Sequence, residues 1–156
     1  MLRGSILTAV LVATVVALAA GTALGPLATD MYLPAMPAMA EALNTGPDRI
    51  QQTLSLYMAG FALAQLVCGP ISDRFGRRPV MIAGLSLFLA ASLLCAWAPS
   101  IEWLLTGRFL QAFGGAAGPV LARASVRDIH GPIEAGRILS YMASTMALAP
   151  ALAPVV

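Results

Sequence analysis

The sequence predicts an all-α membrane protein with five transmembrane helices, from its composition, the length of its apolar runs and the placement of its charges. Apolar residues make up 59% of the chain and charged residues only 10%, whereas a soluble domain usually carries about 25% charged residues. Within a bilayer, every backbone polar group must be satisfied inside a helix or a closed barrel. The apolar runs are much longer than the strands of about ten residues that a barrel needs, so we expect helices.

The first expected span covers residues 5–33, and residues 5–28 carry no charged side chain. The apolar region of a signal peptide is typically about 7–15 residues long, so we interpret this run as an uncleaved helix. We expect the helix to end at Leu33, because a residue that precedes a proline disfavours the helical conformation. Residues 29–49 should form the polar connection to the second span.

Four further apolar runs predict spans at residues 50–71, 79–98, 101–124 and 138–156. Pro79 suits the first turn of the third span, where its missing N–H loses no hydrogen bond. The tight reversal at Gly76 should need a positive φ. In the fifth span, Pro150 and Pro154 are one turn apart and should kink the helix.

The arginines indicate the orientation of these spans. If the spans alternate in direction, seven arginines fall on one side of the membrane and only Arg49 on the other. The seven are Arg3, Arg74, Arg77, Arg78, Arg123, Arg127 and Arg137. Basic residues are enriched in cytoplasmic loops, so we expect a cytoplasmic N-terminus.

The remaining arginine, Arg108, falls inside the fourth span. An arginine at the centre of a span costs about 2.5–3.5 kcal/mol on insertion scales, and such residues usually face the bundle interior and have partners. In the same span, Gly114 and Gly118 form a G-x-x-x-G step, which lets helix backbones approach closely. We expect this step to serve helix packing.

Tyr57, Phe61 and Gln65 recur at every fourth position of the second span. This spacing places them on one face of the helix, where they would line a central substrate cavity. Ordinary packing remains an alternative, in which Gln65 forms a hydrogen bond to a neighbouring helix.

Several function classes are excluded or disfavoured by the composition. The chain contains no lysine, so it lacks the lysine that a phosphate-binding P-loop requires. Its single histidine, His130, has no companions at metal-ligand spacing, and we expect no metal and no cofactor. The basic residues form no nucleic-acid patch, and nothing indicates an enzyme. We interpret Cys68 and Cys95 as packing residues.

Two motifs resemble those of major facilitator superfamily transporters. Residues 69–78 (GPISDRFGRR) closely resemble that superfamily's loop between helices 2 and 3, and all the fixed positions are filled. Residues 108–111 (RFLQ), followed by a glycine-rich run, are similar to its fourth-helix motif, although Ala112 stands where the family favours glycine. Residues 29–37 (TDMYLPAMP), 120–128 (VLARASVRD) and 148–154 (LAPALAP) narrow the resemblance to the bicyclomycin/chloramphenicol-resistance branch of drug:proton antiporters.

This resemblance implies a twelve-helix protein of the bacterial inner membrane that exports small amphipathic drugs in exchange for protons. The chain would then be an incomplete N-terminal six-helix bundle that stops before the sixth helix, since each half of such a transporter contains inverted three-helix repeats. Its partners would be the bilayer, protons, a drug and the missing C-terminal helices. Two alternatives remain open: a truncated, non-transporting membrane protein, and the membrane subunit of an ATP-driven transporter.

The resemblance also implies a cytoplasmic gate at the basic turn. A cluster of Asp73, Arg77 and an acid at the end of the fourth helix, here Asp128, would lock the cytoplasmic side. The motif residues of this expected gate are Gly69, Asp73, Arg74, Gly76, Arg77, Arg78 and Asp128. A solvated turn whose charges only set the topology is the alternative.

Near the outer surface, we hypothesise that Asp30 and Arg108 pair as a proton-coupling site. Arg108 lies eight residues beyond Ser100 and Asp30 four residues before Pro34, which corresponds to depths of about 12 Å and 6 Å at 1.5 Å per residue. A carboxylate next to a cation favours its charged form, and burial opposes this. Gln111 would help to hold the arginine. In the alternative, Asp30 caps a helix in water and Arg108 pairs only with carbonyl groups.

Overall fold

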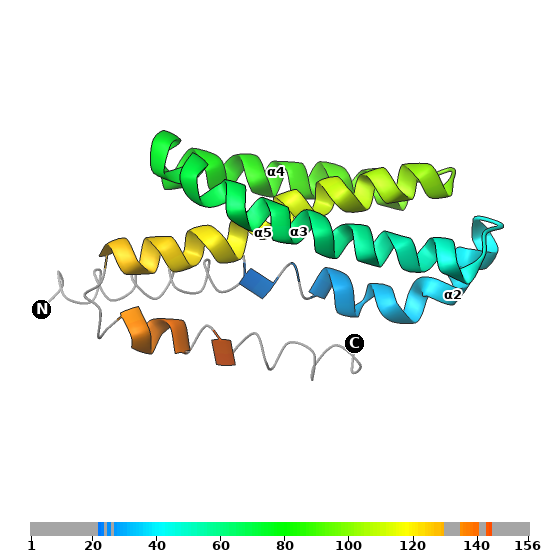
Figure 1. Ribbon diagram of the computed structural model, residues 1–156, viewed down its shortest axis with the longest axis horizontal. Coiled ribbons are helices and arrows are strands. Elements are labelled where there is room, and N and C mark those ends of the chain that lie inside the picture. The colour runs from blue at the N-terminus through cyan, green and yellow to red at the C-terminus, as the bar shows by residue number, and fades with distance from the viewer. Residues whose placement is uncertain (1–21, 24, 26, 130–134, 141–142, 145–156) are drawn as a thin grey trace, which may run out of the picture.

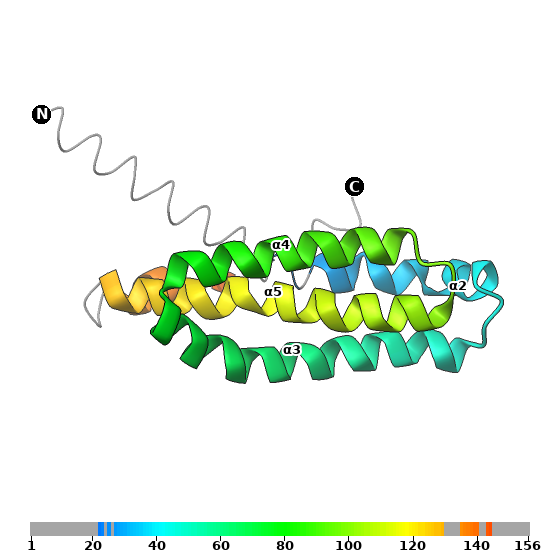
Figure 2. The ribbon, with the colours of Figure 1, turned by 90° about the horizontal axis from the view of Figure 1, so that it is seen from above.

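All the regular structure that the computed structural model describes is helical. The structure describes residues 22–23, 25, 27–129, 135–140 and 143–144. Its labelled helices are α2 (Tyr32–Ala42), α3 (Pro47–Phe75), α4 (Arg77–Ala96) and α5 (Ile101–Ile129), and residues 27–30 and 135–140 are also helical. The helices run roughly parallel or antiparallel to one another, with α5 between α3 and α4 (Figures 1 and 2). The prediction of an all-helical fold is confirmed for this part of the chain.

Two of the described helices, α3 and α4, are long and apolar enough to cross a membrane. Little of either apolar stretch is buried within the chain, and large apolar side chains such as Leu66 and Leu89 are 74% and 63% exposed. Such exposure suits a lipid environment and does not suit water. The count of five spans stays a prediction, because much of the expected first and fifth spans lies outside the described residues, as do Pro150 and Pro154.

At the centre of the bundle, α5 is the most deeply buried described helix. Residues 114–119 of α5 are all buried, and most of them are glycine or alanine. A Cβ atom at Gly114 would lie only 2.4 Å from the backbone nitrogen of Phe88 and 2.6 Å from the carbonyl oxygen of Gly84, both on α4. The backbones of α4 and α5 therefore pack in direct contact here. Gly114 has the packing role that the sequence predicts, and Gly118 is buried in the same helix.

The structure corrects the expected end of the first helix. Instead of a connection from residue 29, the chain is helical through residues 27–30, makes a single turn residue at Met31 and continues as α2 to Ala42. Pro34 is tolerated because it lies in the first turn of α2, where the N–H groups have no intrahelical partner. Only Pro37 interrupts the helix interior. The connection to α3 is therefore short and centres on Asn44, whose φ is 47°.

The boundaries of α3, α4 and α5 differ from the expected spans by a few residues. Helix α3 begins at Pro47, three residues before the expected start, because a proline at the first helical position loses no hydrogen bond and presets φ. The reversal between α3 and α4 is a single residue, Gly76, and its φ of 93° confirms the predicted positive value. Pro79 lies in the first turn of α4, as expected.

The end of the bundle opposite Gly76 is held by an apolar cluster and an ion pair. Ile50 of α3 packs with Ile101 and Leu104 of α5, and α2 adds partly buried side chains to this cluster. At the same end, Arg49 of α3 forms an ion pair of 3.1 Å with Glu102 of α5. These contacts bring the α2–α3 turn and the α4–α5 turn to the same end of the bundle.

Candidate functional site

Arg108 is buried in the middle of the bundle, and a string of hydrogen bonds fixes its guanidinium. The Arg108 side chain extends from α5 and the residue is only 7% exposed. Its Nη1 donates to Oε1 of Gln111 at 2.8 Å, and Nε2 of Gln111 donates to Oγ of Ser92 on α4 at 2.8 Å. Ser92 in turn donates its hydroxyl hydrogen to the carbonyl oxygen of Phe88 at 2.7 Å. Gln111 therefore holds Arg108 in the way that the sequence predicts.

Two tyrosine rings flank the same guanidinium. The Cζ atom of Arg108 lies 3.5 Å from the ring centroid of Tyr32 on α2 and 5.8 Å from that of Tyr57 on α3. A cation over an aromatic face is stabilised, and more strongly where water is excluded. Tyr57 also donates from its hydroxyl to the carbonyl oxygen of Gly25 at 3.3 Å. The charge of Arg108 is thus accommodated by aromatic rings and by one amide.

Asp30 lines an open hollow of about 270 Å³. The hollow is lined by Gly25, Thr29, Asp30, Tyr57, Met58 and Phe61. Two of the three residues that the sequence predicts for a cavity, Tyr57 and Phe61, are therefore in this lining. The third, Gln65, is exposed elsewhere on α3 and is not part of it.

The expected pair of Asp30 and Arg108 does not form an ion pair in the described structure. Oδ2 of Asp30 and Nε of Arg108 are instead two buried atoms without a hydrogen-bond partner among the described residues. Arg108 contacts Ala28, whose carbonyl oxygen lies 3.5 Å from Nη1, and Tyr32. Ala28 and Tyr32 are four residues apart and share one helix face, whereas Asp30 is two residues from each and faces roughly the opposite way.

The depth expected for Asp30 is also corrected. Because helical structure continues to Ala42, Asp30 lies twelve residues from that end, or about 18 Å at 1.5 Å per residue. Asp30 is therefore well inside the bundle and is not a cap at its surface. Of the alternative in which Arg108 pairs only with carbonyl groups, the structure shows hydrogen bonds from Nη1 to the side-chain carbonyl oxygen of Gln111 at 2.8 Å and to the backbone carbonyl oxygen of Ala28 at 3.5 Å.

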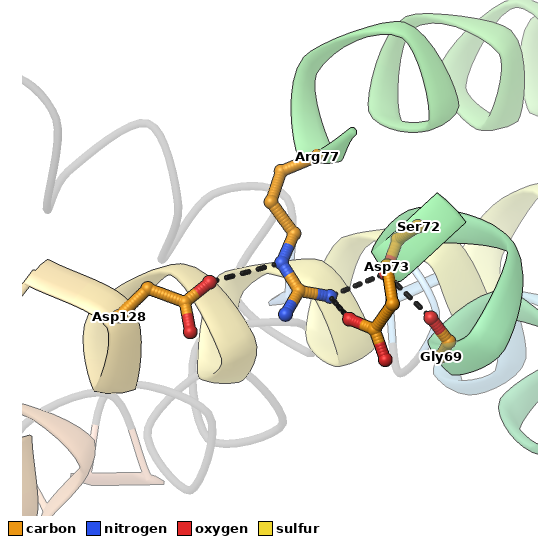
Figure 3. Close-up of polar contacts among 5 residues, drawn as sticks. All are labelled: Gly69, Ser72, Asp73, Arg77 and Asp128. Carbon is orange, nitrogen blue, oxygen red and sulfur yellow. Dashed lines mark hydrogen bonds and ion pairs between the residues drawn. The ribbon is translucent and has the colours of Figure 1, made fainter. Parts of the chain in front are cut away.

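A second polar cluster lies at the end of the bundle that contains Gly76 (Figure 3). Arg77, the first residue of α4, forms ion pairs of 2.8 Å with Asp73 on α3 and 3.1 Å with Asp128 on α5. Its guanidinium also donates to the hydroxyl of Ser72, which donates to the carbonyl oxygen of Gly69 at 2.8 Å. One guanidinium thus joins three helices, and the three expected gate charges lie together.

The other two arginines of the turn have different surroundings. Arg74 stacks on the exposed ring of Phe75, with Cζ 5.6 Å from the ring centroid. Arg78 is exposed in the first turn of α4. Neither forms a side-chain ion pair within the described part of the chain. The cluster therefore depends on Arg77 among the arginines of this turn.

Four polar residues of these two sites were not predicted from the sequence. They are Tyr32, Thr53, Ser72 and Ser92. Thr53 of α3 belongs to the Arg108 site because its hydroxyl is hydrogen-bonded to that of Tyr32. Ser72 is 1% exposed and lies three residues after Gly69; a buried hydroxyl at that spacing in a helix often bonds back to a carbonyl oxygen. No comparable local signal marks the others, because their partners lie on different helices.

Comparison with known proteins gives a family match over nearly the whole chain. The family model described as Major Facilitator Superfamily matches residues 7–156. The chain is 43% identical over 145 residues, or 92% of its length, to a chloramphenicol resistance protein of Pseudomonas aeruginosa. It is 41% identical over 131 residues to YdgK, an uncharacterized MFS-type transporter of Bacillus subtilis, and 38% identical over 130 residues to the multidrug resistance protein MdtL of Citrobacter koseri.

These matches cover most of this chain and a smaller share of each relative. The matched part is 84% of this chain for YdgK and 83% for MdtL. It is 35% of the Pseudomonas protein and 33% of the other two. The chain therefore spans about a third of the length of the curated relatives it matches.

Proposed function

Because this chain belongs to the Major Facilitator Superfamily, we propose that it forms part of a transporter that exports small amphipathic drugs in exchange for protons. Relatives named for chloramphenicol resistance and multidrug resistance support the drug-export part of this proposal. Chloramphenicol, which is named in one relative, is the first substrate to test.

The observation that carries the proposal is the half-buried Asp30, whose Oδ2 has no partner among the described residues and which lines the hollow. A carboxylate in this position would bind either a proton or a hydrogen-bond donor of the drug. The ring of Phe61 and the thioether of Met58 offer apolar surface beside it, and flexible thioethers suit a pocket that accepts varied ligands. Binding of the drug and of the proton would then exclude each other, which is the requirement for exchange.

In this proposal, Arg108 provides a fixed positive charge near Asp30. Gln111 holds the guanidinium from α5, and Tyr32 and Tyr57 cover it. Movement between inward-facing and outward-facing states would open Asp30 first to one side of the membrane and then to the other.

The Arg77 cluster would act as the cytoplasmic gate. Its two ion pairs and its bond to Ser72 link the ends of α3, α4 and α5. In the complete transporter, this linked surface would close against the second half when the cavity opens outward, because alternating access moves one bundle against another.

The proposed location is the inner membrane of a bacterium, with the Arg77 end and the N-terminus in the cytoplasm. Arg74, Arg77, Arg78 and the end of α5 with Arg127 lie at one end of the bundle, as the contact between Arg77 and Asp128 requires. Arg49 lies at the opposite end. This asymmetry supports the orientation through the positive-inside rule.

The substitution Asp30→Asn tests the coupling site in the full-length transporter. In everted membrane vesicles, chloramphenicol should no longer cause proton movement in this variant, because an amide does not titrate. Binding of radiolabelled chloramphenicol should remain measurable. Asp48→Asn, at an exposed carboxylate in the first turn of α3, serves as the matched control and should keep its coupling. Proton-coupled export that survives Asp30→Asn unchanged would exclude Asp30 as the coupling residue.

A further inference from the structure

The Arg77 cluster contains one buried acceptor and two exposed ones. The side chains of Asp73 and Asp128 are 65% and 56% exposed, although each lies within ion-pair distance of the Arg77 guanidinium. Exposed ion pairs hold a side chain weakly, because water screens both charges. Ser72 is 1% exposed, and its Oγ accepts a hydrogen bond from Nη1 of Arg77 (Figure 3). The buried hydroxyl is therefore the acceptor with which water competes least.

The direction of the hydrogen bonds at Ser72 is determined by its own helix. The hydroxyl donates to the carbonyl oxygen of Gly69 at 2.8 Å. A hydroxyl has a single hydrogen and a guanidinium accepts no hydrogen bond, so Oγ of Ser72 serves Arg77 only as an acceptor. Because its hydrogen is already committed to Gly69, the hydroxyl presents a lone pair to Nη1 of Arg77 in a fixed direction.

The backbone of Ser72 also secures the start of α4. Its carbonyl oxygen accepts a hydrogen bond of 3.0 Å from the N–H of Gly76, the residue at which the chain reverses. Arg77 follows directly and begins α4. Ser72 therefore holds the backbone just before Arg77 and one nitrogen at the end of its side chain. With both held, Nη1 lies 2.8 Å from Asp73 and Nε lies 3.1 Å from Asp128.

We propose that Ser72 is a positioning residue of the cytoplasmic gate, whose hydroxyl orients the guanidinium of Arg77 so that it pairs with Asp73 and Asp128 at the same time. This inference rests on the gate role proposed above for the Arg77 cluster. Without the hydroxyl, both remaining carboxylate acceptors are exposed, and the guanidinium would turn between them and water. The ends of α3, α4 and α5 would then be linked for only part of the time, and closure of the cytoplasmic side would slow.

The substitution Ser72→Ala in the full-length transporter tests this role. It removes the acceptor and keeps the backbone carbonyl, and alanine has a higher helix propensity than serine, so the variant should fold. Turnover of chloramphenicol in everted vesicles should fall by about threefold to tenfold, because a hydrogen bond to a charged group is lost. The dissociation constant for chloramphenicol should stay unchanged, since Ser72 lies eleven residues, or about 16 Å, from Phe61 along α3.

Two more variants of Ser72 and one matched control separate orientation of Arg77 from packing. Ser72→Cys keeps the size but offers sulfur, a weak acceptor, and should behave as Ser72→Ala does. Ser72→Thr keeps the hydroxyl and should retain most of the turnover. Ser55→Ala removes an exposed hydroxyl of α3 that also donates to a carbonyl oxygen of its own helix, at 3.4 Å. Its turnover should equal that of the unsubstituted transporter.

A double-mutant cycle with Arg77→Gln shows whether Ser72 acts through the guanidinium. Export by Arg77→Gln should already be low, and Ser72→Ala should lower it no further, because the group that the hydroxyl positions is absent. A role in packing alone would reduce turnover by the same factor in both backgrounds, and this result would overturn the positioning role. Should Ser72→Thr fail to fold, the cycle decides the question by itself.

Failure of this inference can be told from failure of the proposed gate. If Asp73→Asn lowers export and Ser72→Ala leaves turnover unchanged, the positioning role is overturned and the gate stands. If Asp73→Asn leaves export unchanged as well, the gate is overturned together with the inference that rests on it. If Ser72→Ala changes the dissociation constant for chloramphenicol and not the turnover, the hydroxyl acts on drug binding and the positioning role is likewise overturned.

Discussion

At Arg108, a charge that would cost about 2.5–3.5 kcal/mol at the centre of a span is surrounded by side chains of α2, α3 and α5, and α4 contributes indirectly through Ser92. Gln111 accepts its hydrogen bond, the rings of Tyr32 and Tyr57 cover it, and Ser92 holds Gln111 from α4. The hydroxyl of Ser92 is itself committed to a carbonyl oxygen of its own helix. Each member of this string therefore has a fixed role as donor or acceptor, which defines one orientation of the arginine.

The hydrogen bonds from Arg108 to Gln111 and from Gln111 to Ser92 predict which substitution destabilises the protein more. Gln111→Leu removes the shortest hydrogen bond of a buried charge and should lower the free energy of unfolding by about 1.5–3 kcal/mol. Ser92→Ala removes a neutral bond between helices and should cost only about 0.6 kcal/mol. Denaturation of the purified full-length transporter in detergent measures both. The exposed Gln51→Leu is the control, and a loss for Ser92→Ala equal to that for Gln111→Leu would contradict the string.

At the scale of elements, the contact between α4 and α5 is set by small residues. Lipid supplies no hydrophobic force between helices, so close packing of backbones must provide the attraction. Gly84 and Gly114 allow this, because a Cβ atom at Gly84 would lie 2.4 Å from that of Ala117. Helices α3 and α4 cover α5 from two sides (Figure 2).

Gly114→Ala tests this contact. The added methyl group would overlap the backbone of Phe88, which has no flexible end that could move away, so we expect a loss of about 1–3 kcal/mol or more. Gly136→Ala is the control, because a Cβ atom there meets nothing within 4 Å. Thermal unfolding of the two variants in detergent should differ clearly. Equal melting temperatures of the two variants would contradict a tight backbone contact between α4 and α5.

The sequence predicts some of these helices and contacts better than others. Composition and run length predict α3, α4 and α5 to within a few residues, because these helices must cross an apolar layer of fixed thickness. The prediction was wrong at residues 29–42, which are mostly helical. Pro34 does not end the helix there, because it lies in the first turn of α2. The family resemblance implied the Arg77 cluster, including the distant Asp128, whereas the contact between Arg108 and Gln111 is local, because the two residues lie about one helical turn apart.

The contacts of Tyr32, Thr53 and Ser92 were beyond prediction for a physical reason. They depend on how far each helix is rotated about its own axis. Helices that face lipid on one side and apolar neighbours on the other show little amphipathic pattern. The rotation is then decided by shape, such as the glycines of α5, and not by a boundary between apolar and polar faces.

For the whole molecule, the two ends of the bundle differ in charge, and this difference predicts its orientation. After replacement of Cys68 and Cys95, single cysteines at Phe75 and Trp97 provide probes, because these side chains are 65% and 80% exposed. A membrane-impermeant maleimide should label Trp97→Cys in intact cells and Phe75→Cys only after permeabilisation. Labelling of both from the same side would contradict the orientation.

The proposed gate also belongs to the whole molecule, because it closes against helices outside this chain. Asp73→Asn removes one of the two carboxylates that pair with Arg77, and export should fall about tenfold, equivalent to about 1.4 kcal/mol. Stability should change by less than about 1 kcal/mol, because the pair is partly exposed. Glu102→Gln breaks an exposed ion pair at the opposite end and is the matched control. Equal export by both variants would leave the turn with a topological role alone.

Helix α5 is held by an ion pair at each end, through Glu102 to Arg49 and through Asp128 to Arg77. These two carboxylates are about 39 Å apart along the axis at 1.5 Å per residue. A slide of α5 by one turn, about 5.4 Å, would break both pairs together and drive the glycine contact with α4 into bulkier side chains. Sliding along the axis is therefore opposed at three points, whereas tilting of the three helices as one body leaves every one of these contacts intact.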